Sequence, residues 1–558
     1  MPSKKEKTSV TIEKKDRLFN FRPIFFVAVF LSFGIFFAYL HIIKGVSARW
    51  LLCLLPCAAT PIFFCCSWER FFKCLLEILI VGMAFLCGFC TFSTQLSNFS
   101  NVENYNGRTI VTGRVVEKRK YQEVTELILD DLHFGDIEVD GRLNTYLSTT
   151  FCDTVELSDR LLLNGRIEVD VAHEDENGFR ANDVKEKLRY YLRADAVTLA
   201  GHEFDLFLFL RTQLQKTIAL GMDETPAAVM TAVLFGDRSG IELGLYDNIR
   251  MGGIAHIFAV SGLHVGAFFA FCLLLFNKTG LRRLPKAVRF LSVAFILLFY
   301  AGICGFSSSV LRATVMCLVG YAGSLLLTRI DPLESVGLAA IVILLLTPSA
   351  LFEVGFQLSF TACLGIILFS KPIRQVCDEA CLWIVNRLPH KETEAKRLAE
   401  EKGDTLPIGV LGSIRRKVTS FLSVTIAAQI ATSPLLLYYY GYLSGWTLLL
   451  NCVFVPIFTC AFSLFLLSAV LATLLPFFAV GILYVSNVVW TLLLLLFQTA
   501  DFTNFAISSL RINVFAIIPY YAACLFITDK FNLSKSWKIP LFFVGVLAFV
   551  VGMVALNL

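Results

Sequence analysis

The stretch GGIAHIFAVSGLHVGAFFAFCLLLFNK, from Gly252 to Lys278, combines a membrane-spanning apolar run with polar residues that are costly in lipid. His256, Ser261 and His264 lie among Ile, Phe, Val and Leu. Hydrocarbon offers neither hydrogen bonds nor counter-charge, so such groups normally face a polar path or a protein partner. The stretch therefore predicts a membrane helix with a polar face, and polar groups in other spans are its expected partners.

The composition predicts a polytopic α-helical membrane protein. Of 558 residues, 56% are hydrophobic and 17% are charged, whereas a soluble domain carries about 25% charged residues. Many apolar runs approach the roughly 20 residues that cross a bilayer, and we predict about 13 spans, plus or minus two. The predicted spans are residues 21–43, 49–67, 71–94, 254–277, 288–304, 308–329, 335–348, 352–370, 418–438, 446–473, 477–499, 513–528 and 539–557.

Loop charge predicts the orientation in the cell membrane. Lys and Arg crowd the N-terminus, which places it in the cytoplasm by the positive-inside rule. The first apolar run is too long for a cleavable signal, so three retained spans place the next segment outside, and the C-terminus ends outside after the last span. The expected parts are a basic tail at 1–20, three spans at 21–96, an outer domain at 97–203, interfacial helices at 204–250, and a second membrane block at 251–558 with a cytoplasmic loop at 371–417.

The outer segment predicts a small β-barrel. Short runs rich in Val, Ile, Leu and Tyr are separated by turn-forming Asp, Asn and Gly. Five strands in about 100 residues favour an OB-like barrel, although sequence does not give the strand order. The 17 cysteines lie mostly in apolar runs and show no metal-ligand spacing, so we expect no metal site. The predicted strands are residues 109–121, 123–131, 137–148, 160–171 and 190–201.

A basic cluster in this domain is a candidate DNA contact: Lys118, Arg119 and Lys120, followed by Tyr121. OB domains bind single strands with aromatic platforms and cations along a groove. Residues 97–201, however, hold 13 Lys and Arg against 20 Asp and Glu, which repels phosphates on average. The alternative is a solvated hairpin, and any DNA contact here is local.

Four polar clusters interrupt the second membrane block. They suggest one shared polar path, because several separate spans carry such groups. The clusters are Gly252–Gly266, with His256, Ser261, Gly262 and His264; Gly302–Thr314, with Ser307, Ser308, Ser309 and Arg312; Leu351–Phe360, with Glu353, Gly355 and Gln357; and Ala427–Pro434 with Asn451–Phe458, which add Gln429 and Pro456.

The first cluster permits two local structures. As a continuous helix, it places His256 and His264 about 80° apart around the axis, so both flank one face. Gly262 and Gly266 then allow another backbone to approach closely. Alternatively the glycines break the helix and unwound backbone lines a cavity. In a third hypothesis the histidines are only buried, hydrogen-bonded packing residues.

Two enzyme classes fit the same residues poorly. Ala259-Val260-Ser261-Gly262 resembles the nucleophile motif of rhomboid proteases, but it lacks the first glycine, and the later spans offer no histidine as base. Intramembrane metalloproteases need two histidines one turn apart with a glutamate between them, whereas His256 and His264 are eight residues apart without an intervening acid. We therefore predict no enzymatic activity and no cofactor.

The chain resembles the ComEC-type competence family of DNA-uptake channels. Five motifs carry the resemblance in order: LFGDRSGI (Leu234–Ile241), HIFAVSGLHVG (His256–Gly266), GFSSSVLRATVM (Gly305–Met316), PSALFEVGFQLSFTACLGI (Pro348–Ile366) and NCVFVP (Asn451–Pro456). The resemblance implies a membrane channel that carries single-stranded DNA inward during natural transformation. Many members also carry a metallo-β-lactamase-like domain; we expect none here, because no metal motif follows, so a separate nuclease is implied.

The resemblance places the polar clusters along the DNA path. Arg312 with its serines fits phosphate contact, with the alternative that it pairs with Glu353 or Asp237 as a structural lock. Glu353 and Gln357 are one turn apart and fit contact with base edges or with the arginine. Residues expected to shape the structure instead are Asp237, Arg238, Gly266, Gly355, Pro434 and Pro456.

Partners follow from what the chain lacks. It has no GxxxxGK[ST] motif, so a cytosolic helicase-like ATPase is expected to pull the strand, and a DNA receptor is expected outside. Two other functions remain open from the residues alone. One is small-solute transport, although no internal repeat is evident; the other is an envelope-assembly scaffold that acts through the outer β domain.

Overall fold

The computed structural model divides the chain into two compact units. Residues 24–364 and 442–509 form the larger unit, and residues 365–441 with the described part of 510–558 belong to the smaller one. Each unit is described by itself. The structure describes residues 22–47, 68–100, 107–120, 124–152, 154–171, 174–175, 178–236, 240–257, 260, 262–278, 283–326, 330–387, 408–474, 476–499, 506–508, 517, 519–521 and 523–524.

The chain is a mostly helical membrane protein. Within the described residues, 7 helices are long and apolar enough to cross a bilayer. Four shorter apolar helices accompany them, and the predicted spans at 49–67 and 539–557 lie outside the described residues. The seven are Pro23–Ile42, Leu79–Ser100, Lys286–Ile303, Ser309–Leu326, Val354–Cys381, Arg415–Tyr440 and Thr447–Phe465.

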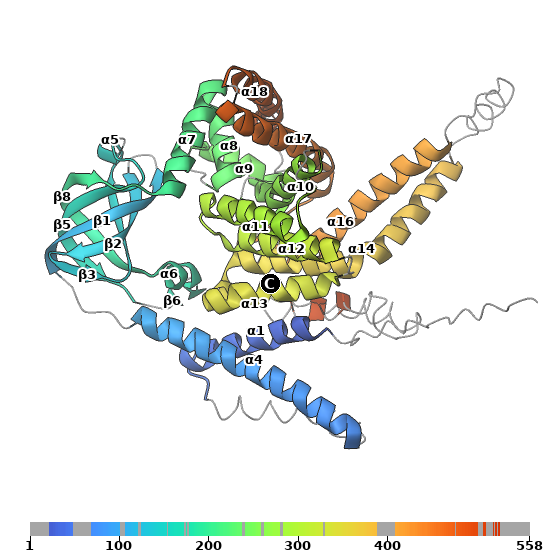
Figure 1. The fold of residues 1–558 in the computed structure, drawn as a ribbon, viewed down its shortest axis with the longest axis horizontal. Coiled ribbons are helices and arrows are strands. Elements are labelled where there is room, and N and C mark those ends of the chain that lie inside the picture. The colour runs from blue at the N-terminus through green and yellow to red at the C-terminus, as the bar shows by residue number, and fades with distance from the viewer. Residues whose placement is uncertain are drawn as a thin grey trace, which may run out of the picture. The chain divides into compact units, whose positions relative to one another are not determined.

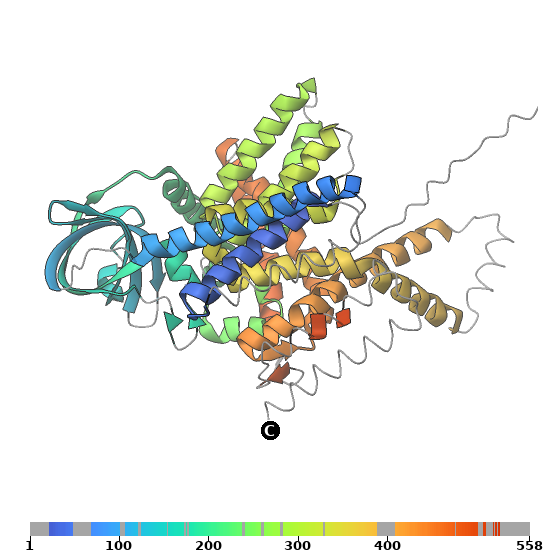
Figure 2. The ribbon, with the colours of Figure 1, turned by 90° about the horizontal axis from the view of Figure 1, so that it is seen from below.

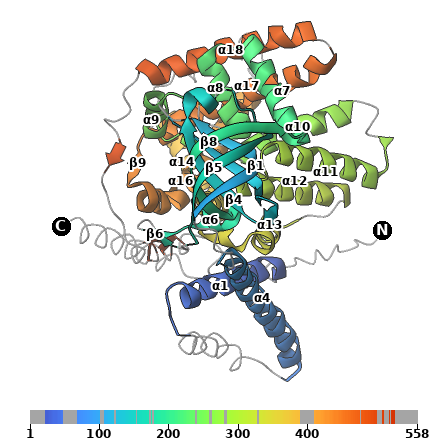
Figure 3. The same cartoon turned by 90° about the vertical axis from the view of Figure 1, so that its left-hand side faces the viewer.

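The predicted five-stranded barrel is confirmed, and the structure supplies its strand order. The strands pair in the order β1-β5-β8-β4-β2, and β2 pairs back to β1, which closes the barrel (Figure 3). β4 and β8 run parallel, and the other pairs are antiparallel. This is the strand order of an OB-fold. The strands are β1 (Gly107–Lys120), β2 (Val124–Phe134), β4 (Arg142–Ser148), β5 (Asp159–Val169) and β8 (Leu188–His202).

Alternation of side chains builds the barrel core. Along β5, Leu161, Leu163 and Ile167 are fully buried, while residues between them face outward. A side chain at Gly165 would overlap the Arg193 carbonyl oxygen, so glycine lets β5 and β8 approach there. Short elements complete the domain: β3 (Ile137–Val139) at the edge of β2, α5 (Thr149–Cys152), the pair β6 (Glu174–Asp175) and β7 (Gly178–Phe179), and α6 (Ala181–Glu186).

The membrane helices of the larger unit form two packed groups (Figure 1). One group surrounds Trp490, Phe458 and Phe462, all at most 2% exposed. It comprises α7 (Leu206–Gly221), α8 (Glu224–Phe235), α9 (Leu243–Met251), α17 (Thr447–Leu474) and α18 (Pro476–Thr499). The second group comprises α10 (Gly262–Lys278), α11 (Lys286–Ile303), α12 (Ser308–Leu326) and α13 (Pro332–Leu346). A small two-stranded sheet pairs β9 (Tyr442–Ser444), which follows α16 (Ile408–Tyr440) in the chain, with β10 (Ala506–Ser508), which follows α18.

The predicted continuous helix over 254–277 is wrong at its beginning. The chain turns at Gly252 and Gly253, forms a single 3-10 turn, η1 (Ala255–Ile257), and becomes α-helical only at Gly262. Gly253 has φ +77°, and a side chain there would overlap the hydroxyl of Thr447 in α17. The break lies at Gly252 and Gly253, whereas Gly262 begins α10 and Gly266 lies within it. His256 therefore lies before α10 rather than within it.

Helices α14 and α16 extend into the segment predicted as a polar loop. α14 (Val354–Arg387) continues past residue 371, and α16 begins at Ile408 rather than at 418. Pro434 within α16 cannot donate the hydrogen bond that the Ile430 carbonyl would normally accept. The Tyr520 hydroxyl donates to that carbonyl at 2.8 Å, and the Tyr521 hydroxyl donates to the next one at 2.7 Å. Pro434 therefore lies inside α16, and tyrosine hydroxyls satisfy the neighbouring carbonyl oxygens.

Two glycines bring α1 (Pro23–Ile42) and α4 (Trp68–Ser100) into direct backbone contact (Figure 2). A Cβ at Gly34 would overlap the Phe85 carbonyl oxygen, and one at Gly88 would overlap the Leu31 carbonyl oxygen. Close contact of this kind is how membrane helices gain packing energy, because lipid gives no hydrophobic drive between them.

We predict that Gly88→Leu separates α1 from α4, because the added side chain has no room. The expected cost is about 1–3 kcal/mol of stability, measured as a lower midpoint of thermal unfolding in detergent. Gly82→Leu on the same helix is the matched control, since a side chain there meets nothing within 4 Å. Equal loss in both variants would contradict the close crossing.

Candidate functional site

Arg312 is a buried cation at the N-terminal end of α12. Its side chain is 3% exposed, and its Nη2 donates to the Ser309 hydroxyl at 3.3 Å. The guanidinium carbon lies 5.4 Å from the centre of the Phe360 ring on α14, a cation–π contact. Gly262, the first residue of α10, lies against it: a Cβ there would be 3.7 Å from Nη2. Three helices therefore meet around one guanidinium.

No carboxylate forms an ion pair with Arg312 among the residues that the structure describes. The suggested lock with Glu353 is not formed, because Glu353 pairs with Lys185 at 3.1 Å instead. Asp237 and Arg238, the other residues considered there, lie outside the described residues. Within the described part, Nη1 of Arg312 and the hydroxyl of Ser307 are buried without a hydrogen-bond partner. A buried cation with a spare donor is an anion-binding group by its chemistry.

The opening of α12 adds further donors beside this cation. A turn with Phe306 at φ 50° reverses the chain after α11, and Ser307 accepts the first helical hydrogen bond from Leu311 at 3.0 Å. The first N–H groups of any helix have no partner within the helix and carry a partial positive charge. Ser307 and Ser308 thus stand where a helix favours an anion, one turn before Arg312.

His264 lies in a packed aromatic environment, away from Arg312. It is 0% exposed, and its ring meets Phe458 and Phe462 of α17 edge-on at 4.9 and 5.2 Å. This is the packing alternative stated from the sequence, rather than a position on an open path. His256, by contrast, is exposed on η1, and Ser261 lies outside the described residues.

Helix α10 separates two environments instead of presenting one polar face. Val265 and Phe269 pack with α11 and α12, on the side where Gly262 meets Arg312. His264 and Phe271 pack against the α17–α18 group on the other side. The helix period places these two pairs on different faces. The sequence predicts that His256, Ser261 and His264 face the clusters around Arg312, Glu353 and Asn451 rather than lipid. His264 is buried against Phe458 of the Asn451–Phe458 cluster, and not beside Arg312.

The remaining predicted residues fall into separate places. Asn451 is 8% exposed on α17, one turn after Thr447, and its Oδ1 has no hydrogen-bond partner among the described residues. Gln429 is half-buried on α16 in the smaller unit. Pro456 lies inside α17. Gly266 and Gly355 have open space where a side chain would be, so close packing does not require glycine at either position.

The start of the motif Pro348–Ile366 holds the β domain against the membrane helices. The 3-10 helix η3 (Pro348–Phe352) inserts Phe352 among three rings: Tyr39 of α1 at 4.7 Å, Phe179 of the β domain at 5.1 Å and Phe92 of α4 at 5.6 Å. We call this aromatic cluster, with the Lys185–Glu353 pair beside it, the docking junction. Aromatic contacts of this geometry each add about 0.5–1.5 kcal/mol beyond area burial.

Polar contacts reinforce the docking junction. Gln95 of α4 donates to the Ser349 hydroxyl at 3.1 Å, and its carbonyl oxygen accepts from the Ser349 N–H at 2.9 Å. Glu353 is 8% exposed, and Gln357 donates to the Leu351 carbonyl at 3.0 Å. Glu353 and Gln357, predicted to line the path, therefore stabilise the junction. The sequence carried no signal for Lys185, because a lysine in VKEK is ordinarily solvated.

The basic cluster of the β domain is largely engaged within the domain. Lys118 donates to the carbonyl oxygens of Cys152 and Val155, the latter at 3.1 Å. Arg119 pairs with Glu117 at 2.9 Å and with Glu126 at 3.5 Å. Nothing is described for the Lys120 side chain, and Tyr121 lies outside the described residues. Two of the four predicted DNA contacts thus have structural partners.

One polar pair in the membrane block was not predicted. Asn487 of α18 donates to the Asp223 carboxylate at 2.9 Å and accepts from the Asp223 N–H at 3.0 Å, which joins the residue before α8 to α18. Among the described residues, no group of three or more His, Cys, Asp or Glu is arranged to hold a metal ion.

These features define a class: a multi-spanning membrane protein that carries a five-stranded β-barrel fastened to its helices. A model of the family described as "Competence protein" matches residues 233–530, more than half of the chain. The chain belongs to this competence protein family. The matched region contains the Arg312 site, the motif Pro348–Ile366 and the helices that pack around both.

Two curated proteins are similar over parts of the chain. ComE operon protein 3 of Bacillus subtilis (strain 168) is 28% identical over 231 residues, which are 41% of this chain and 24% of that protein. An uncharacterized MG316 homolog of Mycoplasma pneumoniae is 28% identical over 147 residues, 25% of this chain and 37% of that protein. The chain thus matches about a quarter to over a third of these relatives' lengths. No solved structure matches it.

We predict an energetic coupling between Lys185 and Glu353 across the docking junction. Lys185→Glu places two carboxylates together, and Glu353→Lys strands a buried cation, so each should cost about 3 kcal/mol of stability. The double swap should recover at least about 1 kcal/mol. Thermal unfolding and protease cleavage near residues 174–187 measure the effect.

The matched control is the exposed pair Arg108–Asp195 of the same domain, 2.8 Å apart with side chains 78% and 53% exposed. Its charge swaps should change stability by less than about 1 kcal/mol, because water screens an exposed pair. Additive effects at Lys185 and Glu353 would show that the pair does not hold the junction.

Proposed function

We propose that the chain forms the membrane channel through which single-stranded DNA enters the cytoplasm during natural transformation. Membership of the competence protein family supports this proposal, as does the similarity to ComE operon protein 3. The fold is compatible with the proposed channel function, because a helical membrane block and an OB-type barrel can each contact a nucleic-acid strand.

The observation that carries the proposal is the environment of Arg312. A guanidinium 3% exposed, with a donor that lacks a partner among the described residues and no carboxylate ion pair there, is costly unless an anion visits it. A DNA strand supplies one phosphate charge per nucleotide. Phe360 covers the face of the guanidinium. A phosphate oxygen would therefore approach the edge of the guanidinium, where its N–H groups point.

Passage requires that no position hold the strand too tightly. The site has one cation, the hydroxyls of Ser307 and Ser309, and the first N–H groups of α12, all at one level of the helix. A phosphate would gain a few hydrogen bonds there and then move on. Arg312 is buried in this conformation, so we propose that the strand enters as α10 and α12 separate beside Gly262, where no side chain fills the contact.

Other residues take supporting roles in this proposal. Ser308, Asn451, Gln429, Ser261 and His256 remain proposed contacts along the path. His264, Glu353 and Gln357 act through packing and the docking junction. A DNA receptor outside, a cytosolic helicase-like ATPase and a separate nuclease remain proposed partners, since the sequence carries no phosphate-binding loop for ATP.

We predict that Arg312→Gln lowers uptake of labelled DNA into the cytoplasm at least about 10-fold, because one charged hydrogen-bonding group is lost at the strand's path. Arg312→Lys should give an intermediate loss, since lysine keeps the charge but not the planar donor geometry. Uptake is measured as nuclease-protected label and as transformant number in a deletion strain that expresses each variant.

Lys286→Gln is the control, because it removes one exposed positive charge from the start of neighbouring α11. It should leave uptake unchanged, and immunoblots of membranes check that all variants insert equally. Normal uptake by Arg312→Gln at equal protein level would remove Arg312 from the path. Normal cytoplasmic uptake in the deletion strain itself would refute the channel function.

A further inference from the structure

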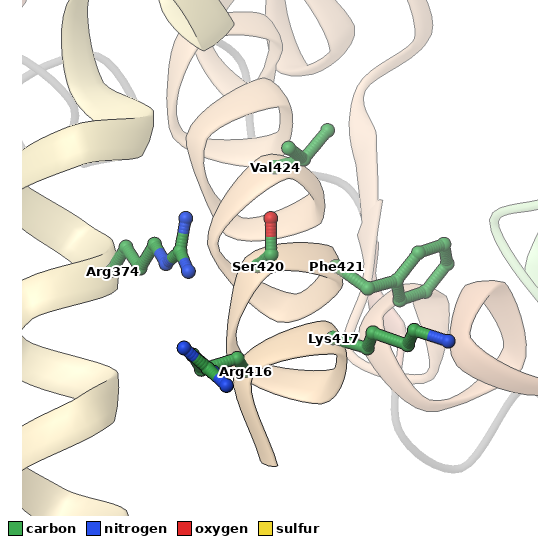
Figure 4. Close-up of a pocket in the computed structure, with 6 residues that line it drawn as sticks. All are labelled: Arg374, Arg416, Lys417, Ser420, Phe421 and Val424. Carbon is green, nitrogen blue, oxygen red and sulfur yellow. The ribbon is translucent and has the colours of Figure 1, made fainter. Parts of the chain in front are cut away.

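The smaller unit contains an open cleft whose lining runs from charged to apolar. Its volume is about 540 Å³, and it lies between α14 and α16. Arg374 comes from α14, and Arg416, Lys417, Ser420, Phe421 and Val424 come from α16 (Figure 4). None of these residues belongs to the Arg312 site or to the docking junction. We call this feature the basic cleft.

Two guanidinium groups face the same space in the basic cleft. Arg374 extends from α14 and Arg416 from α16 into the space between the two helices, and Ser420 lies on α16 one turn after Arg416 (Figure 4). Asp378 is the acidic neighbour: its carboxylate lies 3.7 Å from Arg374 Nε and accepts from the Thr419 hydroxyl at 2.8 Å. Three of the six lining residues are cations and none is an acid, so the lining of the cleft favours an anion.

The lining changes character along α16. Arg416, Ser420 and Val424 follow each other at intervals of four residues, and Lys417 and Phe421 form a parallel row, so both rows lie on neighbouring strips of the helix. The charged end and the apolar end are about 12 Å apart along the axis. Beyond Val424 the helix continues through a segment apolar enough to cross the membrane. The apolar end of the cleft therefore points along the helix toward the bilayer interior.

We propose that the basic cleft binds the phosphate headgroup of an anionic phospholipid. Arg374, Arg416 and Lys417 attract the phosphate, Ser420 donates a hydrogen bond to it, and Phe421 and Val424 contact the first part of an acyl chain. Loop charge predicts that this end of α14 and α16 is cytoplasmic, where basic clefts between membrane helices meet anionic headgroups.

A nucleic-acid strand fits the same cleft less well. A single-strand groove needs cations that follow several phosphates and aromatic rings that stack on successive bases. Along α16, Arg416 and Lys417 come first, and Phe421, the one aromatic ring of the lining, follows one turn later on the way to Val424. This amphiphilic order matches one phosphate joined to hydrocarbon, and the inference does not depend on what the channel carries.

The test is lipid retention by the purified full chain, measured by native mass spectrometry in detergent with equal additions of phosphatidylglycerol and phosphatidylcholine. The wild type should retain phosphatidylglycerol at least about 5-fold better. The double variant Arg416→Gln/Lys417→Gln should lose this preference. The control Lys278→Gln/Lys286→Gln removes two exposed charges from another predicted cytoplasmic loop and should keep it.

Two further additions identify the source of the phosphate. Inorganic phosphate at the same concentration should not displace phosphatidylglycerol, because it gains nothing from Phe421 and Val424, and Phe421→Ala should weaken lipid retention. Displacement by inorganic phosphate would overturn the lipid assignment in favour of a free anion. Retention of a 30-nucleotide single strand that depends on Arg416 and Lys417, without retention of phosphatidylglycerol, would overturn it in favour of nucleic acid. Equal lipid retention by the wild type and the double variant would overturn the proposal outright.

Discussion

The whole membrane block depends on one constraint: within hydrocarbon, every backbone N–H and C=O group must find a partner inside the protein. Three interruptions in the described helices show how backbone groups find such partners. After α9, the Gly253 N–H donates to the Arg250 carbonyl at 2.9 Å, and after α11 the Phe306 N–H donates to the Ala301 carbonyl at 2.8 Å. At Pro434 a tyrosine hydroxyl takes the place of the missing backbone donor. At each of these three positions, a hydrogen bond inside the protein replaces one that the regular helix would make.

The interruptions are also where the polar motifs lie. The break before α10 frees His256 from the helix, the turn before α12 presents Ser307 and the first N–H groups, and the 3-10 turn before α14 carries Phe352 and Glu353. A helix that starts within a membrane protein exposes donors that no neighbour in the same helix can satisfy. The three interruptions before α10, α12 and α14 therefore bring together hydrogen-bonding groups that lack a partner within their own helix. The proposed DNA-contact site at Arg312 and the docking junction both lie at such places.

The same residue types serve two different ends. Arg312 and Lys185 are both cations near helical breaks, yet Lys185 has Glu353 within 3.1 Å and Arg312 has an aromatic ring and a hydroxyl. An ion pair that is largely buried fixes the geometry of what it joins, because breaking it leaves a charge behind. A cation over a ring keeps its edge donors available. The partner, rather than the residue, separates a structural contact from a candidate ligand site.

The sequence by itself determined the membrane character, the positions of most helices, the five strands of the β domain and the family. Apolar length, period-two alternation and ordered motifs are local properties of the chain, so they can be derived without a structure. It also located the polar motifs, but it treated His264, Arg312 and Glu353 as one group.

Only the tertiary structure decided which of these residues meet. Helix α10 has neighbours on both sides, so Gly262 meets Arg312 while His264, two residues later, meets Phe458. Glu353 finds Lys185 from a different domain, far away in the chain. Strand order within the barrel was likewise undetermined, since alternation shows which face is buried but not which strand lies next. Partners across elements depend on packing, and packing is a property of the assembled helices rather than of any single stretch.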